Sequence, residues 1–455
     1  MTRVLFVLIG LSVATAPAHA DISKAEHRAA VRQLRKAASD RDVDEFISAQ
    51  RRVLRLDVPR SVKTVVGAYA ECVDNVDDSL SDTAHYRFHM DVADLFRSIK
   101  GKKALSTISK AQMEHESWCV RLLLLEARQS NVHADGVEAA LTALRDDHPA
   151  VVRRALRFLS ERKTRRVVDA IIACYLRVAK RAGKGKASAD KESAEWERTG
   201  LICASALARL LKVEFTAAED YRNYVNARSG EDALFEPQGD KRDRKKRSTL
   251  FGANVTGKNI VFVLDVSGSM MTVDPIKLTR RKSRKTTVGK RKKSSPKSLK
   301  RHRRIERAKK ELANVIRYLP PDVRFNVVAF SSIVEPWSDD LRSASKKNRS
   351  RAIKYVRSLE PEGITVTDRA LEEALADPSV DSIYLLTDGA PTHVGSVGPE
   401  LPRDAPRLMT QIVERMEEVS FLRGVRIQTF GFRVAEESFL QQLAQRHWGK
   451  YTRIE

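Results

Sequence analysis

One stretch of the sequence constrains the fold of this chain more than any other. Five apolar residues, 260–264, run directly into Asp265, Ser267 and Ser269. An uninterrupted apolar run rich in β-branched residues predicts a strand that is covered on both faces, as in a parallel sheet. Gly268 and the two serines predict a turn at the carboxyl end of this strand, which is where open α/β sheets place their ligand sites.

After this strand, buried apolar runs alternate with amphipathic segments to the end of the chain. Further strands are predicted at 322–330, 382–386, 425–430 and 450–454. Helices are predicted between them at 305–319, 350–359, 367–376, 406–419 and 436–446. This order predicts an α/β domain built on a doubly wound, mostly parallel sheet.

The first half of the chain has a different residue pattern, which predicts helices and almost no strands. Gly and Pro are sparse between about residues 22 and 213, and Leu and Ala recur at steps of three and four. The stretches 119–125 and 151–157 look alike, and the sequence 148–156 resembles the second helix of a HEAT-type repeat. That resemblance covers roughly 116–211 and implies stacked helical hairpins that form a scaffold. An irregular helical bundle is the alternative.

The length of 455 residues suggests about two to four domains, and a hydrophobic content of 42% excludes global disorder. The net charge of +24 is concentrated in the segment 277–304, which is rich in Lys and Arg and has no acidic residue. This basic segment is either a solvated arm or a binding surface for polyanions such as anionic lipids, cell-wall polymers, acidic proteins or extracellular DNA. It lacks aromatic residues, which argues against sequence-specific reading of nucleic acids. Its candidate polyanion-binding residues are Arg280, Arg281, Lys282, Lys290, Arg291, Lys292 and Lys293.

The first twenty residues read as an export signal. Arg3 gives a short positive region, 4–13 is an apolar core, and 18–20 is a small-x-small cleavage site before Asp21. An uncleaved anchor is the alternative. No other apolar run is long enough to span a membrane, so we expect an exported chain, periplasmic or secreted to the cell surface, with no integral span after signal removal.

Four cysteines, at 72, 119, 174 and 203, all precede the apolar strand. In an exported protein they can form two disulfides, and Cys174 with Cys203 is the most plausible pair because these residues should lie on neighbouring helices. Alternatively, all four are buried thiols that pack as small hydrophobic side chains.

The turn after the first strand carries one carboxylate, Asp265, and two hydroxyls, Ser267 and Ser269. Together they form an all-oxygen set, which suits a hard cation such as Mg²⁺ rather than zinc. Two further segments stand in a recognisable order after it: Thr365 precedes a helix, and Asp388 ends a later strand.

These three segments, in this order, resemble a von Willebrand factor A (vWA) domain over about residues 258–455, with Asp265-x-Ser267-x-Ser269 as its metal-ion-dependent adhesion site motif. The resemblance implies that Ser267, Ser269 and Thr365 contact the metal directly, while Asp265 and Asp388 hold metal-bound waters. It implies Mg²⁺, or Mn²⁺ or Ca²⁺, and a partner protein whose Asp or Glu carboxylate completes the coordination. Two features depart from the family pattern, namely Ile364 before Thr365 and the basic insertion 277–304 beside the site.

The expected function is therefore non-enzymatic, metal-dependent protein interaction or adhesion. One alternative is a polyanion-binding protein that acts through the basic insertion and keeps a structural metal. A metal-dependent hydrolase is less well supported, because His115-Glu116 lacks the second histidine of a zinc protease motif and no G-x-S-x-G occurs. The expected organisation is signal peptide 1–20, helical scaffold 21–229, basic linker 230–250 and vWA-like domain 251–455.

Overall fold

The computed structural model describes residues 23–73, 83–129, 136–183, 191–236, 249–274, 302–392 and 405–455. Residues 1–20, most of the basic insertion and most of the expected linker lie outside these ranges. The chain contains two compact units, and the second of them holds α7 and everything that follows it. Within the described ranges, no helix combines the length and the apolar character that a membrane crossing requires.

The first unit is helical, and its helices begin at side chains suited to that role. Ser23 caps the first helix with a capping box, since its Oγ accepts from the Glu26 backbone N–H at 3.2 Å and Glu26 accepts from the Ser23 N–H at 2.8 Å. Asp42 caps the next helix, because its Oδ1 accepts from the Glu45 backbone N–H at 3.0 Å. The helices up to the second unit are α1 (Lys24–Asp40), α2 (Val43–Leu54), α3 (Pro59–Val73), α4 (Thr83–Phe96), α5 (Lys102–Glu114) and α6 (Trp118–Gln129).

The second unit contains further helices before the sheet. These are α7 (Gly136–Ala143), α8 (Pro149–Leu159), α9 (Arg165–Ala182), α10 (Lys191–Leu211), α11 (Ala218–Asn226) and α12 (Glu231–Phe235). Pro149 occupies the first turn of α8, and the pairs α7–α8 and α9–α10 are in extensive contact. The all-helical prediction is confirmed, while the HEAT-like interpretation of this region remains a prediction.

One detail of the helical region differs from the sequence expectations. Helix α12 lies inside the segment expected to be a linker, and it packs against α10 with Leu234 fully buried. The helical region therefore extends to Phe235.

Cys174 and Cys203, the predicted disulfide pair, lie on the neighbouring helices α9 and α10 with their sulfur atoms in hydrogen-bond contact. Cys119 is also buried, whereas Cys72 is half-buried. Burial raises the pKa of Cys203. The disulfide between Cys174 and Cys203 remains a prediction.

The C-terminal part of the second unit is a three-layer domain around a twisted sheet. Its strand order is β5-β4-β3-β7-β8-β9, with β6 also paired to β4. The strands β3, β4, β7, β8 and β9 pair in parallel, which confirms the predicted doubly wound sheet. The strands are β3 (Asn259–Asp265), β4 (Arg324–Phe330), β5 (Val334–Pro336), β6 (Arg342–Ser343), β7 (Ser382–Thr387), β8 (Arg426–Phe432) and β9 (Tyr451–Ile454), and a separate hairpin joins β1 (Thr249–Leu250) to β2 (Ala253–Asn254).

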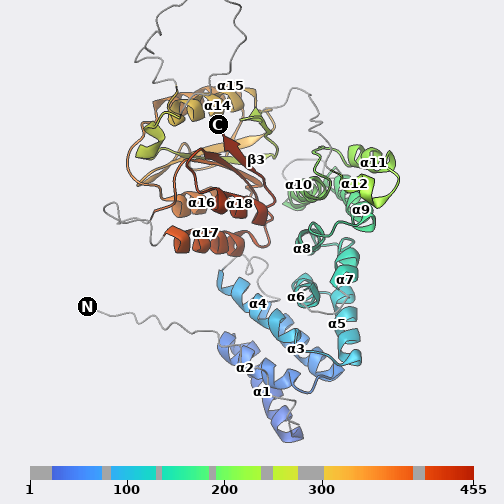
Figure 1. The fold of residues 1–455 in the computed structure, drawn as a ribbon. Helices are drawn as coiled ribbons and strands as arrows, with labels where there is room; N and C mark the ends of the chain where they lie inside the picture. Colours follow the sequence, from blue (N-terminus) through green and yellow to red (C-terminus); the bar gives the residue numbers. More distant parts are fainter. Residues whose placement is uncertain are drawn as a thin grey trace, which may run out of the picture. The chain divides into compact units, whose positions relative to one another are not determined.

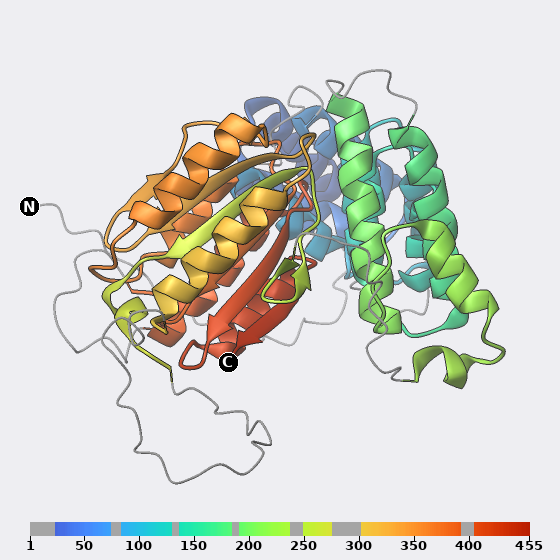
Figure 2. The same ribbon diagram turned by 90° about the horizontal axis from the view of Figure 1, so that it is seen from above.

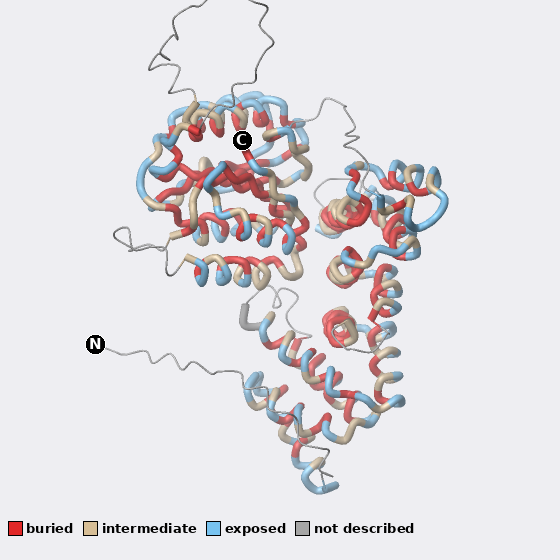
Figure 3. Tube along the Cα trace, viewed as in Figure 1, coloured by how far each residue is buried: buried red, intermediate tan, exposed pale blue. Residues whose placement is uncertain are grey.

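Both faces of this sheet are covered by helices. One face carries α14 (Arg304–Tyr318) and α15 (Lys346–Ser358), and the other carries α16 (Thr367–Leu375), α17 (Ala405–Ser420) and α18 (Glu437–Arg446), as Figure 1 shows. Figure 2 looks onto α14 and α15, which run roughly along the strands. The strands therefore form the most deeply buried layer of the domain (Figure 3).

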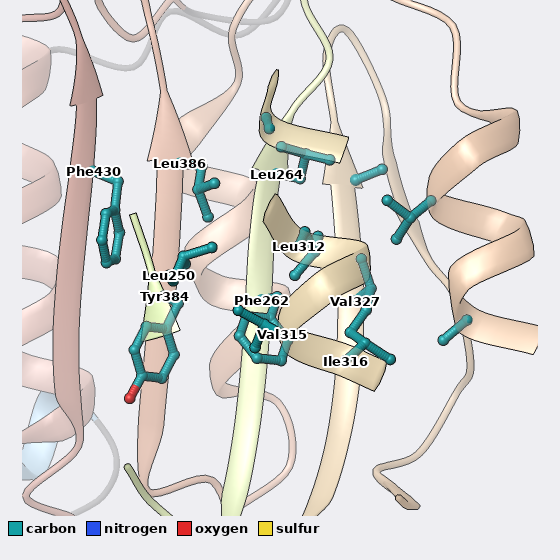
Figure 4. Packing of buried hydrophobic residues seen from close by; sticks show 14 of the residues in the cluster. Leu250, Phe262, Leu264, Leu312, Val315, Ile316, Val327, Tyr384, Leu386 and Phe430 are labelled. Carbon is teal, nitrogen blue, oxygen red and sulfur yellow. The ribbon is translucent and has the colours of Figure 1, made fainter. Parts of the chain in front are cut away.

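The alternation of side chains along β3 explains why its apolar run is continuous. Phe262 and Leu264 point to the face that carries α14, where they pack with Leu312 (Figure 4). Val261 and Val263 point to the opposite face and pack with α16 and α17. Because β3 lies between β4 and β7, chain connections leave it on both sides, and its carboxyl end is the topological switch point of the sheet.

Arginines of α8 and α10 tie the helices of the second unit to the opposite, amino end of the sheet. Arg198 is 5% exposed and donates to the backbone carbonyls of Pro378, Ser379 and Arg423, each at 3.1 Å. Glu195 accepts from both Arg198 and Arg153, at 2.9 Å in each pair. These helices thus contact the amino end of the sheet, far from Asp265. This contact does not cover the carboxyl end of the sheet.

Candidate metal centre

The first part of the site is built directly by the end of β3. Asp265 is fully buried as the last residue of the strand, and its Oδ1 accepts from the Ser267 backbone N–H at 2.8 Å. This bond turns the chain into a short 3-10 helix, η2 (Gly268–Met271), with Ser267 as its N-cap. The Oγ atoms of Ser267 and Ser269 are consequently 3.0 Å apart.

The neighbouring strand β7 supplies the second carboxylate. Thr387, its last residue, donates to Asp265 Oδ2 at 2.5 Å, and the next residue is Asp388. Ser269 Oγ donates to Asp388 Oδ1 at 2.6 Å. A continuous chain of hydrogen bonds therefore links Asp265, Thr387, Asp388 and the serines at the ends of two adjacent parallel strands.

Thr365 reaches the same place from the loop between α15 and α16. The Gly268 N–H donates to the carbonyl of Gly363 at 3.1 Å, and Gly363 has a φ of +74°, which glycine adopts without strain. A Cβ on Gly389 would lie 3.4 Å from Thr365 Oγ1 and 3.8 Å from Ser269 Oγ, so both hydroxyls border Gly389. The structure thus brings all five predicted residues together.

The loop that carries Thr365 is held by a second threonine. Thr392 Oγ1 accepts from the Thr365 N–H at 2.9 Å, and the Thr392 N–H donates back to the Thr365 carbonyl at 2.8 Å. Ile364, which departs from the family pattern, donates its N–H to Ser332 Oγ at 3.1 Å. Neither contact displaces Thr365 from the site.

Two residues of the site were not expected from the sequence. Arg304 donates from Nη1 to Asp388 Oδ2 at 2.7 Å, and from Nε and Nη2 to Asp274 Oδ1 at 2.8 and 2.6 Å. These three side chains are at most 5% exposed. Arg304 had been counted as the last residue of the basic insertion, whereas it is the first residue of α14. The only hint in the sequence was a single acid, Asp274, just before a run of cations.

The ends of the insertion meet beside this ion pair. Val273 and Arg303 form an antiparallel bridge, and the Arg304 N–H donates to the Thr272 carbonyl at 3.0 Å. The candidate polyanion-binding residues lie between these two ends and outside the described residues: Arg280, Arg281, Lys282, Lys290, Arg291, Lys292 and Lys293.

Burial shapes the electrostatics of the site. It raises the pKa of Asp265 to about 6, against the hydrogen bonds from Ser267 and Thr387, and the nearby charge of Asp388 adds to the rise. Burial lowers the pKa of Arg304, but its hydrogen bonds to Asp274 and Asp388 outweigh this and leave that pKa raised. The site therefore concentrates negative charge that solvent does not stabilise.

The donor set fits a hard divalent cation. The 3.0 Å separation of the two serine oxygens is the spacing of neighbouring ligands on an octahedral Mg²⁺, about 3.0 Å for Mg–O distances of about 2.1 Å. Among the described residues no group of three or more His, Cys, Asp or Glu side chains converges, so the ligands available here are hydroxyls and two carboxylates. Ser267, Ser269 and Thr365 would hold the ion, with Asp265 and Asp388 balancing its charge.

A family model for the von Willebrand factor type A domain matches residues 294–453. The C-terminal domain of this chain is a vWA domain. The match includes Thr365 and Asp388 but begins after Asp265, Ser267 and Ser269, which the structure places beside them. The matched part begins inside the insertion between Asp274 and Arg303, which follows the motif at the end of β3.

Curated proteins that match the chain are inter-alpha-trypsin inhibitor heavy chains. Heavy chain H4 of Bos taurus is 27% identical over 209 residues, which is 43% of this chain and 18% of that protein. Heavy chain H4 of Homo sapiens is 28% identical over 215 residues, or 45% and 19% of the two chains. Heavy chain H2 of Mus musculus is 31% identical over 147 residues, or 30% and 12%. The chain thus spans less than a fifth of the length of these relatives.

Solved structures with a similar fold include a von Willebrand factor type A protein from Catenulispora acidiphila and the PilB minor pilin from Streptococcus sanguinis. The first is 21% identical with a TM-score of 0.30 and covers 45% of this chain and 40% of that one. The second is 16% identical with a TM-score of 0.31 and covers 45% and 59%.

Proposed function

We propose that this protein is a non-enzymatic interaction module whose vWA domain binds a partner protein through a divalent cation. The observation that carries the proposal is the convergence of three hydroxyls and two carboxylates, from three separate segments, at the switch point of the sheet. Mg²⁺ is the expected cation, with Mn²⁺ or Ca²⁺ as substitutes. An ion held mainly by neutral hydroxyls stays electron-poor and gains from an Asp or Glu carboxylate on the partner.

The same proposal includes export of the chain. Its support is the apolar core 4–13 and the small-x-small sequence at 18–20, which lie outside the described residues. In this view the vWA domain acts in the periplasm or at the cell surface, and the helical region is the scaffold that presents it.

The test is cation binding by the purified protein, measured by titration calorimetry with Mg²⁺ and Mn²⁺. Ser267→Ala/Ser269→Ala should abolish binding because it removes the pair of oxygens 3.0 Å apart. The control is Ser379→Ala, a serine at the opposite edge of the sheet that bonds Asp377. Wild-type protein that binds neither ion, or a double variant that binds like wild type, rules the proposal out.

The basic insertion supports a second candidate function, a polyanion-binding protein. Its ends join the vWA domain at Val273 and Arg303, so the positive charge of 277–304 enters and leaves the fold beside the metal site. Counterion release makes such binding strongly dependent on salt. Binding to heparin-like or lipid polyanions that survives removal of the cation with EDTA, and is lost in high salt, favours this function over the first.

A further inference from the structure

Arg304 lies buried between two carboxylates at the edge of the proposed cation site. It bridges Asp388 and Asp274 through three N–H groups at 2.6–2.8 Å. The exposed fractions of these side chains are 5% for Arg304, 5% for Asp274 and 0% for Asp388. Because water screens them little, the positive charge of Arg304 acts strongly on any ion bound nearby.

The ion pair also divides the two oxygens of Asp388 between different partners. Oδ2 accepts from Arg304 at 2.7 Å, while Oδ1 accepts from Ser269 Oγ at 2.6 Å. The guanidinium therefore fixes which oxygen of Asp388 faces the serine hydroxyls. A carboxylate held in this way offers the cation site one oxygen and has no free second oxygen for chelation.

The net charge of the hydrogen-bonded side chains determines whether the site, once a cation is bound, attracts or repels a carboxylate ligand. It contains three carboxylates, Asp265, Asp274 and Asp388, and one buried guanidinium, Arg304, so one positive charge offsets three negative ones. A divalent cation neutralises the remaining two negative charges. Without Arg304, the loaded set would keep a negative charge, which repels a carboxylate. Arg307, 3.4 Å from Asp274 and a quarter exposed, adds a more strongly screened positive charge.

We propose that Arg304 is a specificity-determining residue of the vWA site, which weakens binding of the free cation and strengthens binding of a carboxylate by the cation-loaded site. The inference rests on the proposed function and deepens it. Cation and acidic ligand then bind with positive coupling, because the carboxylate supplies the negative charge that Arg304 withholds from the ion.

The experiment uses the full chain, with Mn²⁺ as the cation and acetate as the carboxylate. Titration calorimetry gives Mn²⁺ affinity, and water-proton relaxation reports acetate that displaces water from bound Mn²⁺. Arg304→Gln should bind Mn²⁺ about tenfold more tightly, and its loaded form should bind acetate several-fold more weakly. Asp274→Asn removes a negative charge from the same cluster. It should therefore weaken Mn²⁺ binding and strengthen acetate binding by the Mn²⁺-loaded form.

Two further variants separate charge from local structure. Arg317→Gln removes a cation from the far end of α14, where Arg317 bonds Asn314, and should change neither affinity. Arg304→Lys keeps the charge and should stay close to wild type in both measurements. It also serves as the folded reference if circular dichroism shows that Arg304→Gln has lost structure.

The outcomes separate this inference from the proposed function. The inference is overturned if folded Arg304→Gln binds Mn²⁺ as weakly as wild type or more weakly, or if acetate binding does not fall. It is equally overturned if Asp274→Asn and Arg304→Gln shift affinity in the same direction. If wild type binds Mn²⁺ and Ser267→Ala/Ser269→Ala does not, the proposed function stands whatever Arg304→Gln shows.

Discussion

Thr387 Oγ1 donates a 2.5 Å hydrogen bond to Asp265 Oδ2, joining the carboxyl ends of β7 and β3. Both side chains are buried, at 1% and 0% exposure. The Ser267 backbone N–H donates to Asp265 Oδ1. Both oxygens of this carboxylate, which has no access to bulk water, therefore accept a hydrogen bond. The orientation of Asp265 in the proposed cation site is therefore set by a residue of the neighbouring strand.

Replacing this threonine by its nearly isosteric apolar counterpart tests that link. Thr387→Val should lower the free energy of unfolding by about 1–3 kcal/mol, since it leaves a buried acceptor without its donor. It should also weaken Mn²⁺ binding, because Asp265 loses its orientation. Urea unfolding and titration calorimetry measure the two effects. Thr429→Val, which removes a buried 2.8 Å bond to the Leu440 carbonyl, should cost stability and leave Mn²⁺ binding unchanged.

Gly363 should tolerate no side chain. Its φ of +74° is strained for other residues, and an added Cβ would collide with Ser332 Oγ. Gly363→Ala should destabilise the domain by about 1–3 kcal/mol and reduce cation affinity, because Thr365 is two residues away. Gly230→Ala is the matched control, with a φ of +96° and no atom within 4 Å of the added Cβ. Equal effects of the two substitutions on cation binding would contradict this expectation.

Arg198 should contribute strongly to the stability of the second unit. Arg198→Met removes the donors of three backbone carbonyls, those of Pro378, Ser379 and Arg423, and leaves Glu195 with one fewer partner. We expect a loss of about 3 kcal/mol or more in urea unfolding, as for other broken buried charge pairs. Arg166→Met breaks an exposed pair with Glu138 and should cause no measurable loss. A comparable result for both would show that the buried contacts contribute little.

Stability should also depend on pH through His447. Burial lowers its pKa to about 3, with help from the charges of Arg157 and Arg446, and its Nε2 has no hydrogen-bond partner among the described residues. Since the unfolded chain takes up this proton near pH 6.5 and the folded chain does not, stability should fall as the pH drops from 6.5 toward 3. The loss at pH 5 is about 2 kcal/mol.

His447→Gln isolates this contribution. It should flatten the dependence of unfolding free energy on pH between 6.5 and 4, measured by urea titration at several pH values. Asp265, with its raised pKa of about 6, acts in the opposite sense, since its contribution is present at low pH and lost as the pH rises through 6. A variant that keeps the slope of wild type would exclude His447 as its source.

The sequence predicted the centre of this fold better than its edges. The β3 run and the motif that follows it predicted the buried strand and the position of Asp265, because local apolar pattern and turn chemistry agree there. The edge strands β5 and β6 were missed, since Val334–Pro336 is short and contains a proline, and its pairing depends on β4 alone.

The missed residues share one physical cause, which is that their roles depend on distant partners. Arg304 ends a run of cations, and nothing in the local sequence distinguishes it from the other cations of that run. The folded positions of Asp388, just after β7, and of Asp274 make it a buried ion-pair residue. Cys174 and Cys203, by contrast, lie side by side as expected, because neighbouring helices in the sequence pack against each other.

The bridge between Val273 and Arg303 makes this edge of the domain a tolerant insertion point. Because the bridge joins the two ends of the insertion, the segment between Val273 and Arg303 can change in length and composition without altering the distance between β3 and α14. A relative with only a few residues at this position needs no rearrangement of the sheet, and an engineered tag placed there would lie next to the proposed cation site while leaving both termini untouched.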